Sequence, residues 1–337
     1  MKKSTMADVA KLAGISKSTV SQYINNRFTY MSEPTKERIK DAIEELQYVP
    51  NFTAKSLKQK KTRTIGVIVA NILHSFTTEV IRAIEDECER NNFQLIVCNA
   101  DDNSAKERKY IDILLAKQVD GLIIFPTTGN FDYYQYLKEL QFPVVFIDRK
   151  VDGNIYPTFL LDNDAAAEIA VESFYQNGIQ EAGIVLPPLK KNMTPREERL
   201  EGFRKALARR GIQLKEDWIV EGNSQKVSEH LKTLYRNNDL PKGFFTVNDV
   251  SLIELLKFLK SKRLKIPRDI NVITIDFSVY LDLLNPPITI IKQPTVEIGV
   301  EAASCLLKEI QEEERKQEYE LRRFTPVTHI ESEQIKK

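Results

Sequence analysis

Short apolar runs alternate with helical patterns from residue 65 to residue 276, and this alternation constrains the fold more than any other feature of the chain. In the first series the expected strands are 65–70, 93–99, 121–125 and 144–148, and the expected helices are 79–88, 104–118 and 132–140. In the second series the expected strands are 182–186, 218–222, 243–247 and 271–276, and the expected helices are 164–176, 196–210, 225–236 and 250–261. Alternation of this kind predicts parallel sheets that are covered on both faces. The sequence therefore predicts an α/β protein with two doubly wound lobes.

Polar or aromatic side chains directly follow four of the expected strands. In parallel α/β sheets ligands bind beyond the carboxyl ends of the strands, and with two facing lobes the site is the cleft between them. The residues at these places are Asn71, His74, Ser75, Phe76 and Thr78 after the first strand, then Asp148 with Arg149, Asn248 with Asp249, and Asp276. One such set is common in turns, but four sets at the same topological place indicate a polar ligand site.

The N-terminal fifty residues have a different pattern, that of three short helices. Thr5 can cap a first helix with apolar residues at three- and four-residue intervals, and Gly14 supplies the turn that ends it. Ser16 can cap a second helix with Val20 on its buried side, and a third helix opens after Ser32. Two short helices joined through a glycine turn indicate a helix-turn-helix. Periodicity alone fits a generic helical bundle equally well.

The distribution of charge favours a DNA-binding role for this segment. Residues 1–63 contain thirteen Lys and Arg and six Asp and Glu, a net charge of +7, whereas the whole chain carries only +1. Basic charge concentrated at one end is typical of a nucleic-acid-binding module attached to a neutral or acidic domain.

Length and composition exclude several classes of protein. A chain of 337 residues with 42% hydrophobic residues has room for two or three domains. No run approaches the roughly eighteen apolar residues of a membrane-spanning helix, and no signal peptide is evident, so we expect a cytoplasmic protein without a membrane partner. Cys88, Cys98 and Cys305 are widely spaced in apolar surroundings and are expected to be buried free thiols.

Sequence motifs give no indication of catalysis. The three histidines are scattered, and the chain has no phosphate loop, H-E-x-x-H run or G-x-S-x-G run. The neighbouring acids Asp101 and Asp102, and likewise Glu197 and Glu198, point apart and are expected on solvated faces. We therefore expect no catalytic residues, no metal and no cofactor.

Three stretches, DVAKLAGISKSTVSQYIN, YVPNFTAKSL and IGVIV, resemble the LacI/GalR family of bacterial transcription regulators, and the similarity covers nearly all of the chain. The resemblance implies a helix-turn-helix headpiece at 1–50, a hinge helix and linker at 51–63, and a two-lobed effector-binding and dimerisation domain, like a periplasmic binding protein, at 64–337. It also implies a repressor of carbohydrate catabolism whose affinity for operator DNA is controlled by a sugar or sugar acid.

By the same resemblance, the DNA contacts lie in the second helix and in the hinge. The second helix faces the major groove, and Leu57 matches the hinge residue that wedges between base pairs in the minor groove. A solvated linker with an incidental leucine is the alternative for residues 51–57. The implied DNA-binding residues are Thr5, Ser16, Lys17, Ser18, Thr19, Ser21, Gln22, Asn25, Asn51, Ala54 and Leu57.

Two departures from the family pattern affect specificity. Gln22 stands where much of the family has arginine, and Gln pairs best with adenine whereas Arg pairs best with guanine. The base that faces Gln22 is therefore predicted to be A. The loop at 186–198 also departs from the shorter pattern of the family, just before Arg199.

The resemblance places the effector pocket between the lobes, where Arg199 matches the arginine that grips the effector. The implied effector-binding residues are His74, Phe76, Thr78, Asp148, Arg196, Arg199, Asn248 and Asp276. Arg196 and Arg199 lie on nearly the same helix face, so we expect a cationic pocket. Such a pocket suits a sugar acid, for example a ketodeoxygluconate-type intermediate.

The C-terminal region bears on the assembly of the protein. Residues 285–310 resemble the crossover between the lobes, and the tail lacks the leucine heptads of a tetramer-forming coiled coil. We therefore expect a homodimer on double-stranded, palindromic operator DNA. Two alternatives stay open, namely a regulator that responds to a corepressor or a partner protein, and a sugar-binding protein without a role on DNA.

Overall fold

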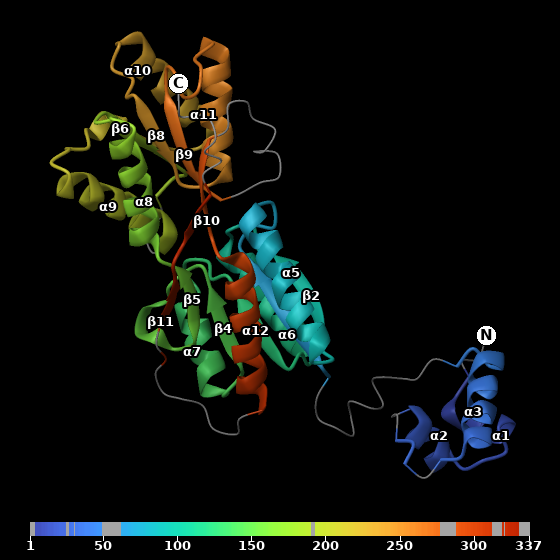
Figure 1. The fold of residues 1–337 in the computed structure, drawn as a ribbon. Helices are drawn as coiled ribbons and strands as arrows, with labels where there is room; N and C mark the ends of the chain where they lie inside the picture. Colours follow the sequence, from blue (N-terminus) through green and yellow to red (C-terminus); the bar gives the residue numbers. More distant parts are fainter. Residues whose placement is uncertain are drawn as a thin grey trace. The chain divides into compact units, whose positions relative to one another are not determined.

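The computed structural model describes residues 4–24, 27–29, 31–48, 62–189, 193–276, 288–311, 319 and 321–329. The chain divides into two compact units, Met1–Thr62 and Arg63–Lys337, each with its own apolar core (Figure 1).

The described part of the first unit contains three helices, α1 (Met6–Leu12), α2 (Lys17–Ile24) and α3 (Glu33–Glu45), as the periodicity predicts. Thr5 and Asp8 form a capping box, because each side chain accepts a hydrogen bond from the backbone N–H of the other. Gly14 follows α1 with a φ of 65°, a left-handed conformation that favours glycine. The helices pack around Val9, Ala10, Ala13, Val20, Ile39, Ala42 and Tyr48.

The first lobe of the second unit contains a six-stranded sheet in the order β11-β5-β4-β3-β1-β2. Its strands are β1 (Thr64–Val69), β2 (Gln94–Asn99), β3 (Gly121–Ile124), β4 (Val144–Ile147), β5 (Thr158–Leu161) and β11 (Leu321–Phe324). All of these pairings are parallel. Helices α5 (Ser75–Arg90) and α12 (Thr295–Gln311) share one apolar core with the sheet, and α6 (Ser104–Ala116) and α7 (Phe131–Glu139) share another. In β1, Ile65 and Val67 contribute to the first core and Ile68 to the second, as alternation along a strand requires.

The second lobe also contains a six-stranded sheet, in the order β12-β10-β9-β8-β6-β7. Its strands are β6 (Ala182–Leu186), β7 (Ile219–Glu221), β8 (Gly243–Thr246), β9 (Asn271–Ile275), β10 (Thr289–Lys292) and β12 (Val327–His329), and its helices are α8 (Asn163–Gln176), α9 (Thr194–Arg209), α10 (Ser224–Arg236) and α11 (Asp249–Lys262). The expectation of parallel sheets is wrong at one edge, because β12 is antiparallel to β10. The chain enters β12 from β11 of the other sheet through two residues, without a crossover helix.

One strand of the first lobe was not predicted. Between β4 and β5 the chain has a 3-10 turn, Asp152–Asn154, instead of a helix. Alternation of strands and helices therefore gave no signal for β5.

The described elements show three crossings between the lobes, after β5, after β10 and between β11 and β12 (Figure 1). The first and third crossings are joined, because the backbone N–H of Asp162 donates to the carbonyl of Phe324 at 2.8 Å. After the second crossing α12 packs against α5 in the first lobe. Gly299 permits this approach, since a Cβ there would lie 2.6 Å from the Cβ of Ala83. The expected crossover at 285–310 is thus confirmed in its described part.

Candidate functional site

The start of α2 presents a group of hydroxyls to solvent. The Oγ of Ser16 accepts a hydrogen bond from the backbone N–H of Thr19 at 3.2 Å and so caps the helix. The same Oγ lies 2.6 Å from the Oγ of Ser18 and 2.8 Å from the Oγ1 of Thr19. Lys17 and Gln22 are also exposed. This end of α2 therefore offers donors and acceptors of the kind that contact phosphates and base edges.

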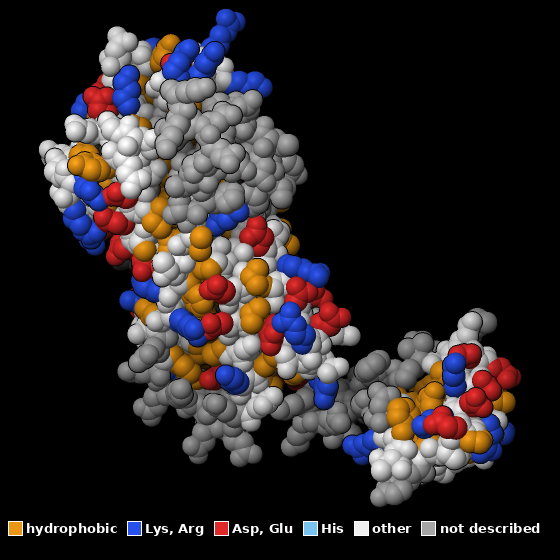
Figure 2. All heavy atoms as spheres, in the orientation of Figure 1, with side chains coloured by type: hydrophobic (Ala, Val, Ile, Leu, Met, Phe, Trp, Pro, Cys, Tyr) orange, Lys and Arg blue, Asp and Glu red, His pale blue; other side chains and the backbone are white. Residues whose placement is uncertain are grey.

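The other expected DNA-binding residues have different surroundings. The hydroxyl of Thr5 donates to Asp8 at 2.6 Å, as part of the capping box of α1, and Ser21 is half-buried. Asn25, Asn51, Ala54 and Leu57 lie outside the described residues. Figure 2 shows basic and acidic side chains interspersed over the visible face of residues 63–337. The excess of basic charge rests on the sequence count, +7 over residues 1–63 against +1 for the whole chain.

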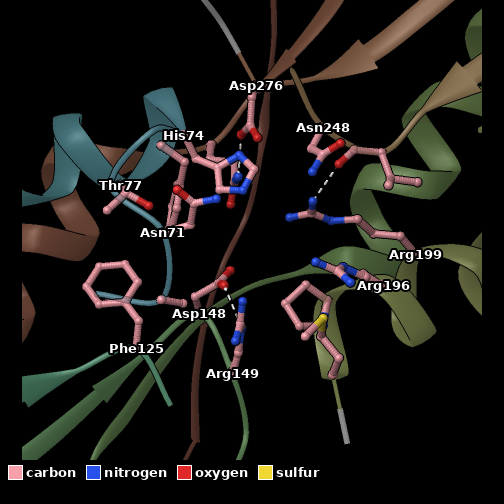
Figure 3. A pocket seen from close by; sticks show the side chains of 16 residues that line it. Asn71, His74, Thr77, Phe125, Asp148, Arg149, Arg196, Arg199, Asn248 and Asp276 are labelled. Carbon is pink, nitrogen blue, oxygen red and sulfur yellow. Dashed lines mark hydrogen bonds and ion pairs between the residues drawn. The ribbon is translucent and has the colours of Figure 1, made fainter. Parts of the chain in front are cut away.

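The second candidate site is a cleft between the carboxyl ends of the two sheets (Figure 3). The described residues that line it are Ala70, Asn71, His74, Phe76, Thr77, Phe125, Asp148, Arg149, Met193, Pro195, Arg196, Arg199, Val247, Asn248, Asp276 and Gln293. Both lobes contribute, through the loops after β1, β3 and β4 and through those after β6, β8, β9 and β10.

Asp148 and Asp276 occupy corresponding positions in the two lobes. Each is the first residue after a buried strand, β4 or β9, and the two have φ angles of 72° and 77°. A positive φ in a residue other than glycine is uncommon, and such conformations cluster at functional sites. The backbone therefore turns sharply at both strand ends and leaves both carboxylates at the cleft (Figure 3).

The Asp276 carboxyl is buried, and this burial raises its pKa to about 6 although the positive charge of Arg199 opposes the shift. The Nε2 of Gln293 donates a hydrogen bond to its Oδ1. The Oε1 of Gln293 has no hydrogen-bond partner within the described ranges, and the residue is only 8% exposed. A buried acceptor without a partner at a cleft wall is a place for a donor from a ligand.

His74 and Asp249 join the lobes across the cleft. His74 precedes α5 and Asp249 opens α11, and the Nδ1 of His74 lies 2.8 Å from the Oδ1 of Asp249. Burial alone would lower the pKa of His74, but the hydrogen bond and charge of Asp249 raise it above its usual value. Conversely, burial would raise the pKa of Asp249, but the contact with His74 lowers it. Both shifts favour the charged pair.

Arg199 is the most deeply buried arginine of α9, and its position is fixed from two sides. Its Nε donates to the Oδ1 of Asn163 at 2.8 Å, and its Nη1 donates to the carbonyl of Val247 at 2.6 Å. Asn248, the next residue, caps α11 with its Oδ1, which accepts from the backbone N–H of Ser251 at 3.0 Å. The amide group of Asn248 therefore has a fixed orientation beside Arg199 (Figure 3).

Arg149 and Arg196 approach the same acid, Asp102. The Nη2 of Arg149 lies 2.7 Å from one oxygen of Asp102, and the Nη2 of Arg196 lies 3.7 Å from the other. The Nε of Arg149 also lies 3.6 Å from Asp148. Burial lowers the pKa of Arg196, an effect that the charge of Asp102 opposes. Arg196, one of the two arginines expected in the cleft, thus lies beside Asp102, an acid that the sequence predicts on a solvated face.

The structure brings seven of the eight expected effector residues to the cleft, namely His74, Phe76, Asp148, Arg196, Arg199, Asn248 and Asp276. Thr78 requires a correction: it is exposed, its hydroxyl donates to the carbonyl of Ser75 at 2.9 Å, and Thr77 lines the cleft instead. Phe125 was missed although it follows β3 in the same way that Asp148 follows β4. Gln293 was missed because its position depends on the second crossing between the lobes.

Other expectations concern metals, membranes and thiols. Among the described residues no group of His, Cys, Asp and Glu could hold a metal ion. No helix within the described ranges is long and apolar enough to cross a membrane. All three cysteines are free, and burial raises the pKa of Cys88 to about 12, but Cys98 and Cys305 are only half-buried. The expectation of full burial is therefore correct for Cys88 alone.

A helix-turn-helix unit followed by a two-lobed unit of the periplasmic-binding type defines a class of bacterial DNA-binding regulators. Residues 5–51 match the family described as "Bacterial regulatory proteins, lacI family", and residues 62–326 match "Periplasmic binding proteins and sugar binding domain of LacI family". The chain therefore belongs to the LacI family of bacterial transcription regulators.

Individual relatives agree with this assignment. The chain is 45% identical over 332 residues to the "Probable HTH-type transcriptional regulator EndR" of Paenibacillus polymyxa, covering 97% of this chain and 98% of the relative. It is 30% identical over 311 residues to the HTH-type transcriptional repressor PurR of Aliivibrio salmonicida, covering 91% and 92%. The fold matches a crystal structure of the lac repressor dimer bound to operator and the anti-inducer ONPF, with a TM-score of 0.82, 23% identity and coverage of 97% and 98%.

Proposed function

We propose that this protein is a repressor of carbohydrate catabolism whose affinity for operator DNA is controlled by a sugar bound in the cleft. The observation that carries the proposal is the arrangement of Asp148 and Asp276, one from each lobe, around Arg199. Vicinal hydroxyls present donors and acceptors at fixed spacing, and carboxylates and a guanidinium bind both. The description of the matching family as a sugar binding domain supports the same class of effector.

A neutral sugar fits the charges of the cleft better than a sugar acid. Arg149 and Arg196 already share the carboxylate of Asp102. Of these three arginines, Arg199 alone has no acid at ion-pair distance among the residues that the structure describes. Asp148 and Asp276 would repel the carboxylate of a sugar acid. The cationic pocket expected from the sequence is therefore largely compensated, and the neutral effector is the first candidate.

On the DNA side, α2 enters the major groove of a palindromic operator, and a homodimer places one headpiece on each half-site. Residues 51–57 act as the hinge between the headpiece and residues 64–337. A role on bacterial DNA places the protein in the cytoplasm. Effector binding changes operator affinity to the extent that the effector prefers one arrangement of the lobes.

The experiment that tests this proposal is a titration of operator DNA, obtained by in vitro selection, monitored by fluorescence anisotropy. The panel contains glucose, ribose, cellobiose, gluconate and 2-keto-3-deoxygluconate. We expect one neutral sugar to weaken operator binding by about tenfold, which corresponds to a coupling free energy of about 1.4 kcal/mol. Release of the operator by a sugar acid, but by no neutral sugar, would contradict the prediction of a neutral effector. Specific DNA binding with no response to any compound would favour a regulator that depends on a corepressor or a partner protein.

The same selection tests the role of Gln22. We expect A at the half-site base that faces this residue, and the Gln22→Arg variant should select G there, with a discrimination of about 1–3 kcal/mol. The exposed Lys17→Gln variant serves as a control that should weaken binding to all sequences without changing this base. A fixed G selected by the wild-type protein would contradict the prediction.

A further inference from the structure

Arg199 is the first member of a chain of polar contacts that leads out of the cleft. Its Nε donates to the Oδ1 of Asn163 at 2.8 Å, and the Nδ2 of Asn163 donates to Glu198 at 2.8 Å. Glu198 in turn accepts two hydrogen bonds from the guanidinium of Arg323, at 3.0 and 2.7 Å. The four side chains therefore form one continuous path.

The interior of this path is closed to water. Asn163 is 2% exposed and Arg199 is 5% exposed, so the amide of Asn163 depends on these two neighbours for its hydrogen bonds. Burial would raise the pKa of Glu198, but hydrogen bonds from Arg323 and Asn163 lower it, which favours the carboxylate. Consecutive residues of a helix point about 100° apart. Arg199 can thus face the cleft while Glu198 faces the crossings.

The two ends of the path belong to different lobes. Glu198 and Arg199 lie on α9 of the second lobe, whereas Arg323 lies on β11, at the edge of the first-lobe sheet. Arg323 also donates to the carbonyl of Leu161, at the end of β5, at 3.3 Å. These residues adjoin the first and third crossings, which the hydrogen bond from Asp162 to Phe324 holds together.

We propose that Glu198 and Arg323 are positioning residues that couple occupancy of the cleft at Arg199 to the angle between the lobes. The proposal rests on the proposed function, because it describes how an effector in the cleft acts on the crossings. A ligand that recruits the guanidinium of Arg199 competes for the hydrogen bond to Asn163. Since the same amide of Asn163 accepts from Arg199 and donates to Glu198, a change at Arg199 alters the contact of Glu198 with Arg323 on β11. Neither Glu198 nor Arg323 is among the described residues that line the cleft.

The test uses full-length Glu198→Gln, Arg323→Gln and the double variant. Calorimetry measures the affinity for the sugar of the panel that binds the wild-type protein, and anisotropy measures operator affinity with and without that sugar. We expect sugar affinity to stay within about threefold of wild type, while the ratio of the two operator affinities falls by about threefold or more. The double variant should lose no more coupling than either single variant, because both remove one contact.

A matched control is available on the same helix. Arg204 of α9 forms a two-fold hydrogen-bonded pair with Glu216, at 2.7 and 3.0 Å, but this pair lies on the exposed surface within the second lobe. Glu216→Gln should leave the ratio unchanged. If Glu198→Gln and Arg323→Gln also bind the sugar and keep the wild-type ratio, the proposal is overturned, even if both variants unfold at a lower temperature.

Hydrogen exchange separates failure of this proposal from failure of the proposed function. If the wild-type protein binds its operator but none of the sugars, the assignment of the effector is wrong. Amide hydrogen exchange then tests the path from Arg199 to Arg323 without an effector. Glu198→Gln and Arg199→Lys should each accelerate amide exchange in peptides covering 158–166 and 321–326, whereas Glu216→Gln should not. Wild-type exchange rates in both variants would overturn the proposal independently of any effector.

Discussion

At the scale of single residues, the titration of Asp276 gives a direct test of the cleft. A carboxyl group accepts hydrogen bonds from sugar hydroxyls with both of its oxygens only when it is ionised. In the free protein, burial raises the pKa of Asp276 to about 6. Binding that requires the ionised form weakens as the pH falls below this value. Between pH 7 and pH 5 we expect sugar affinity to fall by about tenfold. Calorimetry at a series of pH values measures this change.

The Asp276→Asn variant is the control for this prediction. It should bind the sugar more weakly at pH 7 and lose most of the decline between pH 7 and pH 5. Any dependence that remains belongs to His74, whose pKa is also raised. A wild-type affinity that rises on acidification would show that the protonated carboxyl is the form that binds.

The sequence identified the residues of the cleft that follow strands, because the position of a strand end is a local property. Asp148 and Asp276 were found in this way, and their positive φ angles agree with a functional role. Asp102 was not found, since its partners Arg149 and Arg196 are distant in the sequence and meet it only in the folded chain. The charge of the cleft therefore could not be predicted from its arginines alone.

At the scale of elements, the packing of α12 on α5 depends on Gly299. A Cβ at this position would lie 2.6 Å from the Cβ of Ala83 and 2.8 Å from the carbonyl of Val80, which real Cβ atoms do not tolerate. The Gly299→Ala variant must therefore move one helix, although alanine favours helix formation by up to about 1 kcal/mol. We expect a net loss of about 1–3 kcal/mol in the free energy of unfolding, measured with denaturant.

The Val296→Ala variant, in the same helix, is the matched control. Val296 is 64% exposed, so its truncation should change the free energy of unfolding by no more than about 0.5 kcal/mol. Equal stability of Gly299→Ala and the wild-type protein would mean that the two helices separate at little cost.

Strands that alternate with helices were predictable, whereas β5 and the sheets that β11 and β12 join were not. β5 follows β4 through a 3-10 turn, and β11 and β12 are separated by two residues yet belong to different sheets. A sequence pattern shows that a segment is extended but does not show which sheet it joins. The antiparallel edge formed by β12 depends on the third crossing, which is a property of the completed fold.

At the scale of the whole molecule, the two lobes were predictable from the repeated pattern, but the contacts that hold them were not. His74 and Asp249 are separated by 175 positions in the sequence and meet because α5 and α11 begin on opposite walls of the cleft. Each was selected only as a polar residue after a strand. The pairing turns two local features into a link between lobes, and its charge makes that link dependent on pH.

The His74→Gln variant tests this link through the pH dependence of stability. Because the folded pKa of His74 is raised, its contribution is fully present below the unfolded value of about 6.5 and is lost as the pH rises through the folded value. The pKa of Asp249 is lowered, so its carboxylate stays ionised throughout this range. The side chains are 22% and 19% exposed, which limits the contribution to about 1 kcal/mol. Denaturant unfolding should therefore show the wild-type protein to be more stable than His74→Gln at pH 6, with a smaller difference at pH 8.

In an Asp249→Asn background the difference should be small at both pH values. The control variant His230→Gln, at the histidine of α10, should not reproduce the difference. Equal stability of His74→Gln and wild type at pH 6 would mean that the desolvation of the two charges cancels their attraction, and that the lobes are held by the crossings and by other contacts such as that of Arg196 with Asp102.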